Sequence, residues 1–364
     1  MRLKALAFGV LLVVSGCVST AYDPGNGGGG GAAGSGGAGG AGSGGAGGGG
    51  SAGAGGGGSG GSSGGVGADK SGNLTADETW TGAINVTGDV TVNAGVTLTI
   101  ADGALVQVAA GKSIIVKGTI KVQGTSATGV NFAPNPMPGT WDGIQVQSGG
   151  SATISYAMMK YPTTGLSCAT GAVGCAMDHS KVTNFSSTGI SLQVSATLDH
   201  VTVETGGSGG VVVLAGAADT VTITDSIFHA TGGDAVIADS GNLTLQYSHM
   251  YGDMTGGNSG VHCATHLATT GVILADHNIM EDANYGLMAS DLAATSKINL
   301  NNFVGYGSGG TGGPYSPAGA NMLNAGVDLT NNYWNGQAPP TNTGTTKVTT
   351  TYQTAMVPGC GPRP

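Results

Sequence analysis

The sequence predicts an all-β solenoid, in which each repeat of the chain forms one coil stacked on the next. Three observations predict it: an apolar pair that recurs eight times, a spacing of 21 to 31 residues between successive pairs, and Gly-rich segments between them. Each pair joins two apolar residues that lie five positions apart. The pairs are Ile154/Met159, Met177/Val182, Leu198/Val203, Ile223/Phe228, Leu245/Met250, Leu274/Ile279, Ile298/Phe303 and Leu329/Trp334.

The residues before these pairs have the period-two alternation of β-strands. Apolar and polar residues alternate from Ile84 to Val92 and from Val96 to Ile100, with Gly, Asn and Asp between such runs. A second apolar column follows the pairs and includes Gly165-Leu166, Gly210-Val211 and Gly260-Val261. We interpret its apolar members as inward residues of a second strand in each coil, and its glycines as tight turns.

The first 17 residues read as a secretory signal, with Arg2 and Lys4 before an apolar run that is too short to span a bilayer. The ending Val14-Ser15-Gly16-Cys17 resembles the bacterial lipobox. The resemblance implies cleavage before Cys17 and lipidation of its thiol, so that acyl chains attach the protein to a membrane. Val18 is not the Asp that favours inner-membrane retention, which indicates the outer membrane of a Gram-negative-type bacterium, facing outward or the periplasm.

Residues 18–67 are predicted to form a disordered tether, because they are rich in Gly, Ala and Ser and have almost nothing to bury. The predicted solenoid covers residues 68–340, and residues 341–364 form a C-terminal tail. The net charge is −9, and the only Arg residues are Arg2 and Arg363. This composition gives no basic footprint for nucleic acid.

Four cysteines remain after Cys17, and three pairings of them are possible. Cys168 and Cys175 flank a short Gly-containing loop, so we expect a disulfide between them. Cys263 and Cys360 would then tie the tail to the solenoid.

Two strings and the repeated pairs carry a family resemblance. GTWDGIQV (Gly139–Val146) and NNYWNG (Asn331–Gly336) resemble right-handed parallel β-helix proteins of the pectin-lyase-like type, over residues 75–340. The resemblance implies a right-handed parallel β-helix. It does not imply one activity, because the same scaffold carries lyases, hydrolases, epimerases, adhesins and passive surface proteins. Trp141 and Trp334 match family positions that pack structurally.

Candidate catalytic residues occur at Asp178-His179 and Asp199-His200, which alignment of the repeats places one coil apart. Asp225 occupies the histidine column in the next coil. Such a row could bind a metal ion or share protons. We favour a polar ladder at a corner of the solenoid. The column reads Tyr156, His179, His200, Asp225, Tyr247, Asp276, Leu300, Asn331.

Asp276, Glu281 and Asp282 form a second group of candidate carboxylates. Glycosidases need two carboxylates about 5–10 Å apart, but a solvated turn explains these residues as well. The resemblance to lyases implies an Arg or Lys base, often with calcium. No Arg occurs in the predicted solenoid, so a lyase is disfavoured.

His262 and His266 are weak candidates for metal ligands. A spacing of four residues places two ligands on one face only in a helix, and this segment reads as a strand followed by a loop. We therefore expect no required cofactor, with calcium or another divalent metal as the alternative.

Tyrosines concentrate in the later coils, where rings could stack on sugars. The candidates are Tyr251, Tyr285, Tyr306 and Tyr315. The sequence thus predicts a surface lipoprotein with a non-catalytic structural, adhesive or glycan-binding role, whose partners are the membrane and polysaccharide or other cell-envelope components. The alternative is a polysaccharide-active lyase or glycoside hydrolase.

Overall fold

The computed structural model describes residues 67–252, 263–281, 285–289, 292–305, 313–317, 327–336 and 351–364. The predicted signal segment, Cys17 and nearly all of the tether lie outside these residues. Val66–Pro364 forms one compact unit. Its described residues contain β-strands and no helix, so the all-β prediction is confirmed. None of the described segments is a helix that could cross a membrane.

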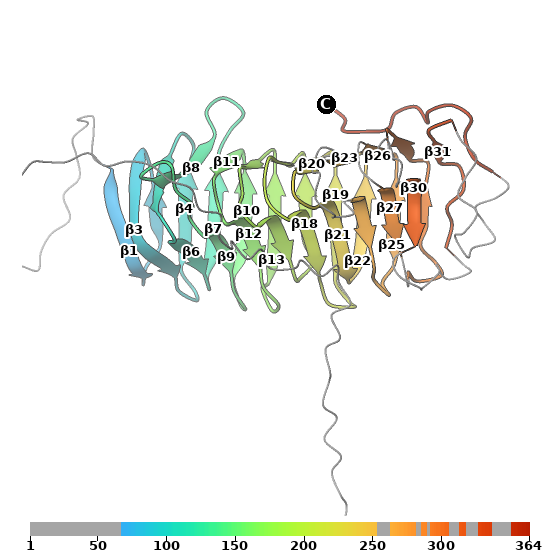
Figure 1. The fold of residues 1–364 in the computed structure, drawn as a ribbon. Coiled ribbons are helices and arrows are strands. Elements are labelled where there is room, and N and C mark those ends of the chain that lie inside the picture. Colours follow the sequence, from blue (N-terminus) through green and yellow to red (C-terminus); the bar gives the residue numbers. More distant parts are fainter. Residues whose placement is uncertain are drawn as a thin grey trace, which may run out of the picture. The chain divides into compact units, whose positions relative to one another are not determined.

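The unit is a parallel β-solenoid in which strands stack into three faces (Figure 1). Most coils contribute one strand to each face. Face 1 is a 10-stranded sheet of β2 (Glu78–Trp80), β4 (Thr97–Ala101), β7 (Thr119–Gln123), β10 (Ser151–Ser155), β13 (Gly174–Asp178), β16 (Ala196–Asp199), β19 (Thr220–Thr224), β22 (Asn242–Gln246), β25 (Ile273–Asp276) and β28 (Lys297–Asn299).

Faces 2 and 3 form one 21-stranded sheet, because the long strand β3 (Ala83–Val92) pairs with β5 through its first half and with β6 through its second. β1 (Ala68–Leu74) pairs with β3 at the N-terminal end. Face 2 continues through β5 (Leu105–Ala109), β8 (Val130–Asn135), β11 (Ala157–Lys160), β14 (Lys181–Thr183), β17 (Thr202–Glu204), β20 (Ile227–Ala230), β23 (His249–Gly252), β26 (Ile279–Glu281), β29 (Asn302–Val304) and β31 (Tyr333–Trp334). Face 3 continues through β6 (Ser113–Val116), β9 (Gly143–Val146), β12 (Thr164–Cys168), β15 (Thr188–Leu192), β18 (Gly209–Leu214), β21 (Asp234–Ser240), β24 (Cys263–Leu267), β27 (Tyr285–Ala289) and β30 (Gly313–Pro317).

The apolar pairs predicted from the sequence point into the core between the faces, with one exception. Both members of the other seven pairs are buried. In the sixth repeat the strand register pairs Leu245 with Ala275, whereas Leu274 is 40% exposed. The sixth pair is therefore Ala275/Met280, and the prediction of Leu274/Ile279 was wrong by one residue.

The second column also needs two corrections. Gly165 and Gly210, and Gly189 at the same position in the coil between them, adopt no left-handed conformation, so they do not mark tight turns. They allow close stacking of coils, since a Cβ atom on Gly189 would lie 2.6 Å from the carbonyl oxygen of Gly210. In the fifth coil the partner of Val236 is Thr265 and not Val261.

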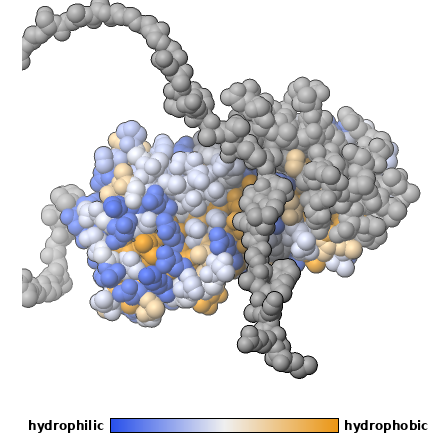
Figure 2. Space-filling view, turned by 60° about the horizontal axis from the view of Figure 1, so that its bottom comes forward, coloured by the Kyte–Doolittle hydropathy of each residue, from blue (hydrophilic) through white to orange (hydrophobic). Residues whose placement is uncertain are grey.

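Large aromatic side chains stack inside the core at two places, one in the early coils and one at the last coil. Phe132 stacks on Trp141 with ring centroids 5.8 Å apart, and Phe303 stacks on Trp334 at 4.5 Å. Trp141 and Trp334 are fully buried, so their expected packing role is confirmed. On the side of the unit shown in Figure 2, hydrophilic and weakly polar residues cover most of the visible described surface, and apolar residues form a narrow band between them.

The cysteines follow one of the two expected pairings. Cys168 and Cys175 form a disulfide across the connection between β12 and β13. Cys360 is a free thiol whose Sγ donates a hydrogen bond to the carbonyl oxygen of Leu300. The expected Cys263–Cys360 disulfide is therefore wrong. Burial raises the pKa of the Cys360 thiol to about 11.

Candidate functional site

The Asp-His pairs of the sequence lie at the corner between face 1 and face 2. From Tyr156 onward, each coil turns there through a residue with a positive φ. Such a backbone conformation is uncommon for residues other than glycine. The residues of this corner column are Tyr156, His179, His200, Asp225, Tyr247, His277, Leu300 and Asn331, with φ between 43° and 61°. The predicted corner ladder is confirmed, except that His277 takes the place expected for Asp276.

Backbone hydrogen bonds explain why the column stacks in register. The amide of His179 donates to the carbonyl of Asp199, and the amide of His200 donates to the carbonyl of Thr224. The rings then stack on one another. The centroids of Tyr156 and His179, and those of His179 and His200, are 4.6 Å apart. Tyr247 and His277 stack at 5.0 Å.

The aspartates belong to the neighbouring column on face 1, and each is bound within it. Ser155 donates to Asp178 at 2.6 Å, Thr224 to Asp199 at 2.6 Å, and Gln246 to Asp276 at 2.7 Å. Each aspartate also lies beside the histidine that follows it, with Nδ1 of His277 2.7 Å from Asp276 Oδ1. These contacts fit an inter-coil ladder.

A second, buried ladder follows the corner column, and the sequence reasoning missed it. Its side chains accept a hydrogen bond from a backbone amide one coil away, as Asn301 does from Asn278 at 3.0 Å. The signal was a Ser or Asn directly after the corner residue in most repeats. The ladder residues are Ser180, Ser226, Ser248, Asn278, Asn301 and Asn332, all buried.

Residues 351–364, which we name the C-terminal strap, run back over this corner from the last coil. Gln353 donates its amide to the carbonyl of Asn332, and Val357 exchanges two hydrogen bonds with the side chain of Asn302. Gly361 donates to the carbonyl of His277. The strap therefore spans several coils and ends beside Asp225.

Arg363 binds Asp225 at the end of the strap. Its Nε and Nη2 atoms donate to the two carboxylate oxygens at 2.7 and 2.6 Å, and its amide donates at 3.0 Å. The guanidinium lies 3.7 Å from the ring centroid of Tyr247, a cation–π distance. Only 4% of the Asp225 side chain is exposed. The hydrogen bond from Arg363 holds the pKa of Asp225 below its usual value, so this carboxylate stays charged.

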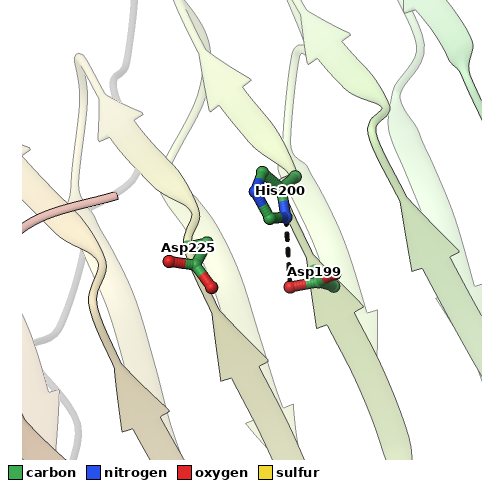
Figure 3. A group of neighbouring side chains, drawn as sticks. All are labelled: Asp199, His200 and Asp225. Carbon is green, nitrogen blue, oxygen red and sulfur yellow. Dashed lines mark ion pairs between the residues drawn. The ribbon is translucent and has the colours of Figure 1, made fainter. Parts of the chain in front are cut away.

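Asp199, His200 and Asp225 converge at this corner (Figure 3). One ligand atom from each lies within 4.8 Å of the other two. Asp178, His179 and Asp276 belong to other coils of the same two columns. Glu281 lies on face 2, and Asp282 lies outside the described residues. The catalytic candidates are thus spread along a corner, and only three of those described converge.

Face 2 carries a separate group of polar side chains, which we name the face 2 track. It comprises Lys181, Glu204, His229, His249, Tyr251 and Glu281. Strand register places Tyr251 between His229 and Glu281 on neighbouring strands. The rings of His229 and Tyr251 stack at 4.3 Å, and His249 Nε2 lies 2.7 Å from Glu281 Oε2. Lys181 forms an ion pair with Glu204.

A pocket of about 220 Å³ adjoins this track and is lined by Lys181, His179, Tyr156 and residues 125–131. Asp102 anchors the pocket loop by accepting hydrogen bonds from Thr125 and Thr128. Burial, followed by the nearby Glu204 carboxylate, raises the pKa of Tyr251, so its hydroxyl stays protonated and can donate.

The other candidate residues do not join this group. Tyr285 and Tyr315 lie on β27 and β30 of face 3, whereas Tyr251 lies on face 2. His266 Nδ1 lies 3.3 Å from Asp234 Oδ2 on face 3. Tyr306 and His262 lie outside the described residues, so their roles remain predictions.

Comparison with protein-family models, curated proteins and solved structures found no match to the chain. The β-solenoid therefore rests on the strand pairing itself, and the pectin-lyase-like likeness remains a resemblance of motifs.

Proposed function

We propose that this protein is a surface-anchored, non-catalytic β-solenoid that binds an extended polysaccharide along the face 2 track. The observation that carries the proposal is the ring cluster of His229, Tyr251 and His249, flanked by Glu204 and Glu281. Apolar ring surfaces beside hydrogen-bonding groups suit sugars, which present both C–H faces and hydroxyls. The pocket beside Lys181 extends the same surface toward the N-terminal coils.

The spacing of the two carboxylates favours binding over hydrolysis. Glu204 and Glu281 are separated by three strand steps along face 2, through His229 and Tyr251. At about 4.8 Å per step their backbones lie about 14 Å apart, so the two side chains would have to lean toward each other to reach the roughly 5–10 Å between the carboxyl groups of glycosidases. Each carboxylate also has a basic partner, Lys181 for Glu204 and His249 for Glu281.

The expected anchor completes the proposal. Lipidation of Cys17 would hold the chain on the outer membrane, and the Gly-rich residues 18–67 would let the solenoid reach a polymer from several orientations. The protein would then attach polysaccharide to the cell envelope without changing it.

Binding to immobilised glycans tests the proposal directly. We expect the double substitution His229→Ala and Tyr251→Ala to weaken binding about tenfold or more, since truncated anchor residues cost over about 1 kcal/mol each. Tyr352→Ala, which removes an exposed tyrosine of the strap, is the matched control and should bind as the wild type does. A wild-type protein that binds no glycan would refute the proposal.

The same preparation discriminates the enzyme alternative. The wild-type protein is incubated with pectate, alginate or similar polymers, and new reducing or unsaturated ends are measured. If such ends form and Glu281→Gln abolishes them, the protein is an enzyme and the binding proposal is wrong. Turnover abolished by Asp199→Ala instead would locate the active site at the corner.

A further inference from the structure

The corner at Asp199, His200 and Asp225 combines the side chains that bind transition metals. Imidazole with carboxylates suits zinc, nickel or copper, whereas calcium and magnesium prefer sites built from oxygen alone. We propose that this corner binds a divalent transition-metal ion through Asp199, His200 and Asp225, and that Arg363 competes with the ion for Asp225. The site is separate from the face 2 track and does not depend on glycan binding.

The distances allow coordination after side-chain rotation. Ligand atoms at about 2.0–2.2 Å from one tetrahedral zinc ion are about 3.3–3.6 Å apart. The three ligand atoms lie within 4.8 Å of one another, so side-chain rotations that move them by about 1 Å bring them into range. Asp199 and His200 have 40% and 29% of their side chains exposed, which leaves room for that rotation.

Two further observations point to a cation at this position. Nδ1 of His200 is buried and makes no hydrogen bond, although it lies 3.2 Å from Asp199 Oδ1. A ring nitrogen that makes no hydrogen bond and faces a carboxylate can serve with it as a metal ligand. In addition, a positive group already occupies the Asp225 carboxylate, because the strap brings Arg363 there from 138 residues away in the sequence.

The corner contains its own comparison site. Asp178 and His179 repeat the Asp-His pair one coil earlier, but the residue that follows them in the corner column is His200 and not a carboxylate. Among the described residues, only the group of Asp199, His200 and Asp225 gathers three such ligands. Asp225 is therefore the residue that distinguishes the proposed site from its neighbour.

Competition with Arg363 predicts how binding responds to substitution. Removing the guanidinium frees the Asp225 carboxylate, so a metal ion no longer has to displace the strap. Arg363 holds both oxygens of the Asp225 carboxylate, so an ion that takes one of them must displace at least one guanidinium contact and loosen the end of the strap.

Calorimetric titration of Zn²⁺ into the full chain without a polyhistidine tag tests the proposal. We expect Arg363→Ala to bind one ion at least tenfold more tightly than wild type, and addition of Asp225→Asn to abolish that gain. Adding Asp178→Asn instead should retain it, which is the matched control because Asp178 is the equivalent carboxylate one coil earlier. Arg363→Gln removes the guanidinium but keeps a polar side chain at the end of the strap, and serves if the alanine variant folds poorly.

Amide exchange gives an independent readout on the unmodified protein. Zn²⁺ should speed exchange in residues 357–363 of wild type and have no such effect in Asp225→Asn. Equal Zn²⁺ affinity in wild type and both Arg363 variants would overturn the proposal, as would a gain that survives Asp225→Asn.

Discussion

Arg363 binds Asp225 through three hydrogen bonds, although the two residues lie 138 positions apart in the sequence. The guanidinium also covers the ring of Tyr247. The contact ends a strap that returns along the corner column from the last coil. Solenoid ends need protection because their strand edges and core are otherwise open. The strap therefore joins the last coils to the middle of the solenoid.

Loss of the Arg363 contact should release the end of the strap first. We expect Arg363→Ala to speed amide hydrogen exchange in residues 357–363 by about an order of magnitude, with little change in the early strands, because local openings depend on local contacts. Arg363→Lys should give an intermediate effect, since lysine keeps the charge and loses the bidentate geometry. Unchanged exchange in both variants would mean that the hydrogen bonds of Val357 and Gly361 hold the strap without Arg363.

Cys360 should react slowly with alkylating reagents. A thiol with a pKa of about 11 contains roughly a hundredfold less thiolate at pH 8 than an ordinary cysteine, and the thiolate is the reactive form. Mass spectrometry under non-reducing conditions should find Cys168 linked to Cys175, with Cys360 alkylated only slowly before denaturation and fully after it. A peptide linking Cys263 to Cys360 would contradict the structure.

The sequence predicted the coils and the corner ladder because both depend on strict periodicity. An inward apolar pair must recur in every coil. Once these pairs are aligned, the residues next to them, including the corner residues, fall at equivalent positions in successive coils. The predicted register was wrong in the sixth repeat, where both alternating sets of residues in the strand contain apolar side chains. Ile273 and Leu274 are adjacent, and the larger Leu274 was chosen over Ala275, which the register places inward. A small inward residue such as Ala275 contributes less to the hydrophobic periodicity of the sequence than a large exposed residue such as Leu274, so the periodicity alone favours the wrong register.

The contacts that define the candidate sites were harder to predict. The Arg363–Asp225 pair joins a tail to a coil that no repeat relates to it, so no column alignment could find it. The face 2 track depends on which polar side chains share one face, and His229 had no motif around it. The buried ladder was missed because polar residues at inward positions break the hydrophobic pattern, although Ser226, Asn278 and Asn301 each follow a corner residue.

The buried ladder should contribute strongly to stability. Asn301 donates to Ala275 and Asn299 carbonyls and accepts from the Asn278 amide. We expect Asn301→Ala to lower the free energy of unfolding by about 3–5 kcal/mol, since each buried group left unpaired costs roughly 1–3 kcal/mol. Asn299→Ala, on the partly exposed side of the same coil, should cost under about 1 kcal/mol. Urea denaturation of the two variants checks the difference, and equal losses would contradict the ladder.

The pair of His266 and Asp234 on face 3 should make stability depend on pH. The hydrogen bond with Asp234, opposed by burial and aided by the charges of Asp234 and Asp239, raises the pKa of His266. A raised histidine pKa means that the folded state holds its proton more tightly than the unfolded state, where the pKa is about 6.5. The stabilisation is therefore complete below about pH 6.5 and is lost as the pH rises through the folded-state pKa. Asp234→Asn should lower the His266 pKa in an NMR titration.

The stability difference between wild type and Asp234→Asn should accordingly shrink as the pH rises. Denaturation at several pH values measures it. The control is Asp69→Asn, which removes a carboxylate from β1, far along the chain from His266, and should give a difference without this pH dependence. A wild-type advantage that stays constant, or that grows with pH, would show that Asp234 does not act through the charge of His266. The expected difference falls with pH, whereas the contradicting outcomes are flat or rising, so a modest pH series separates them.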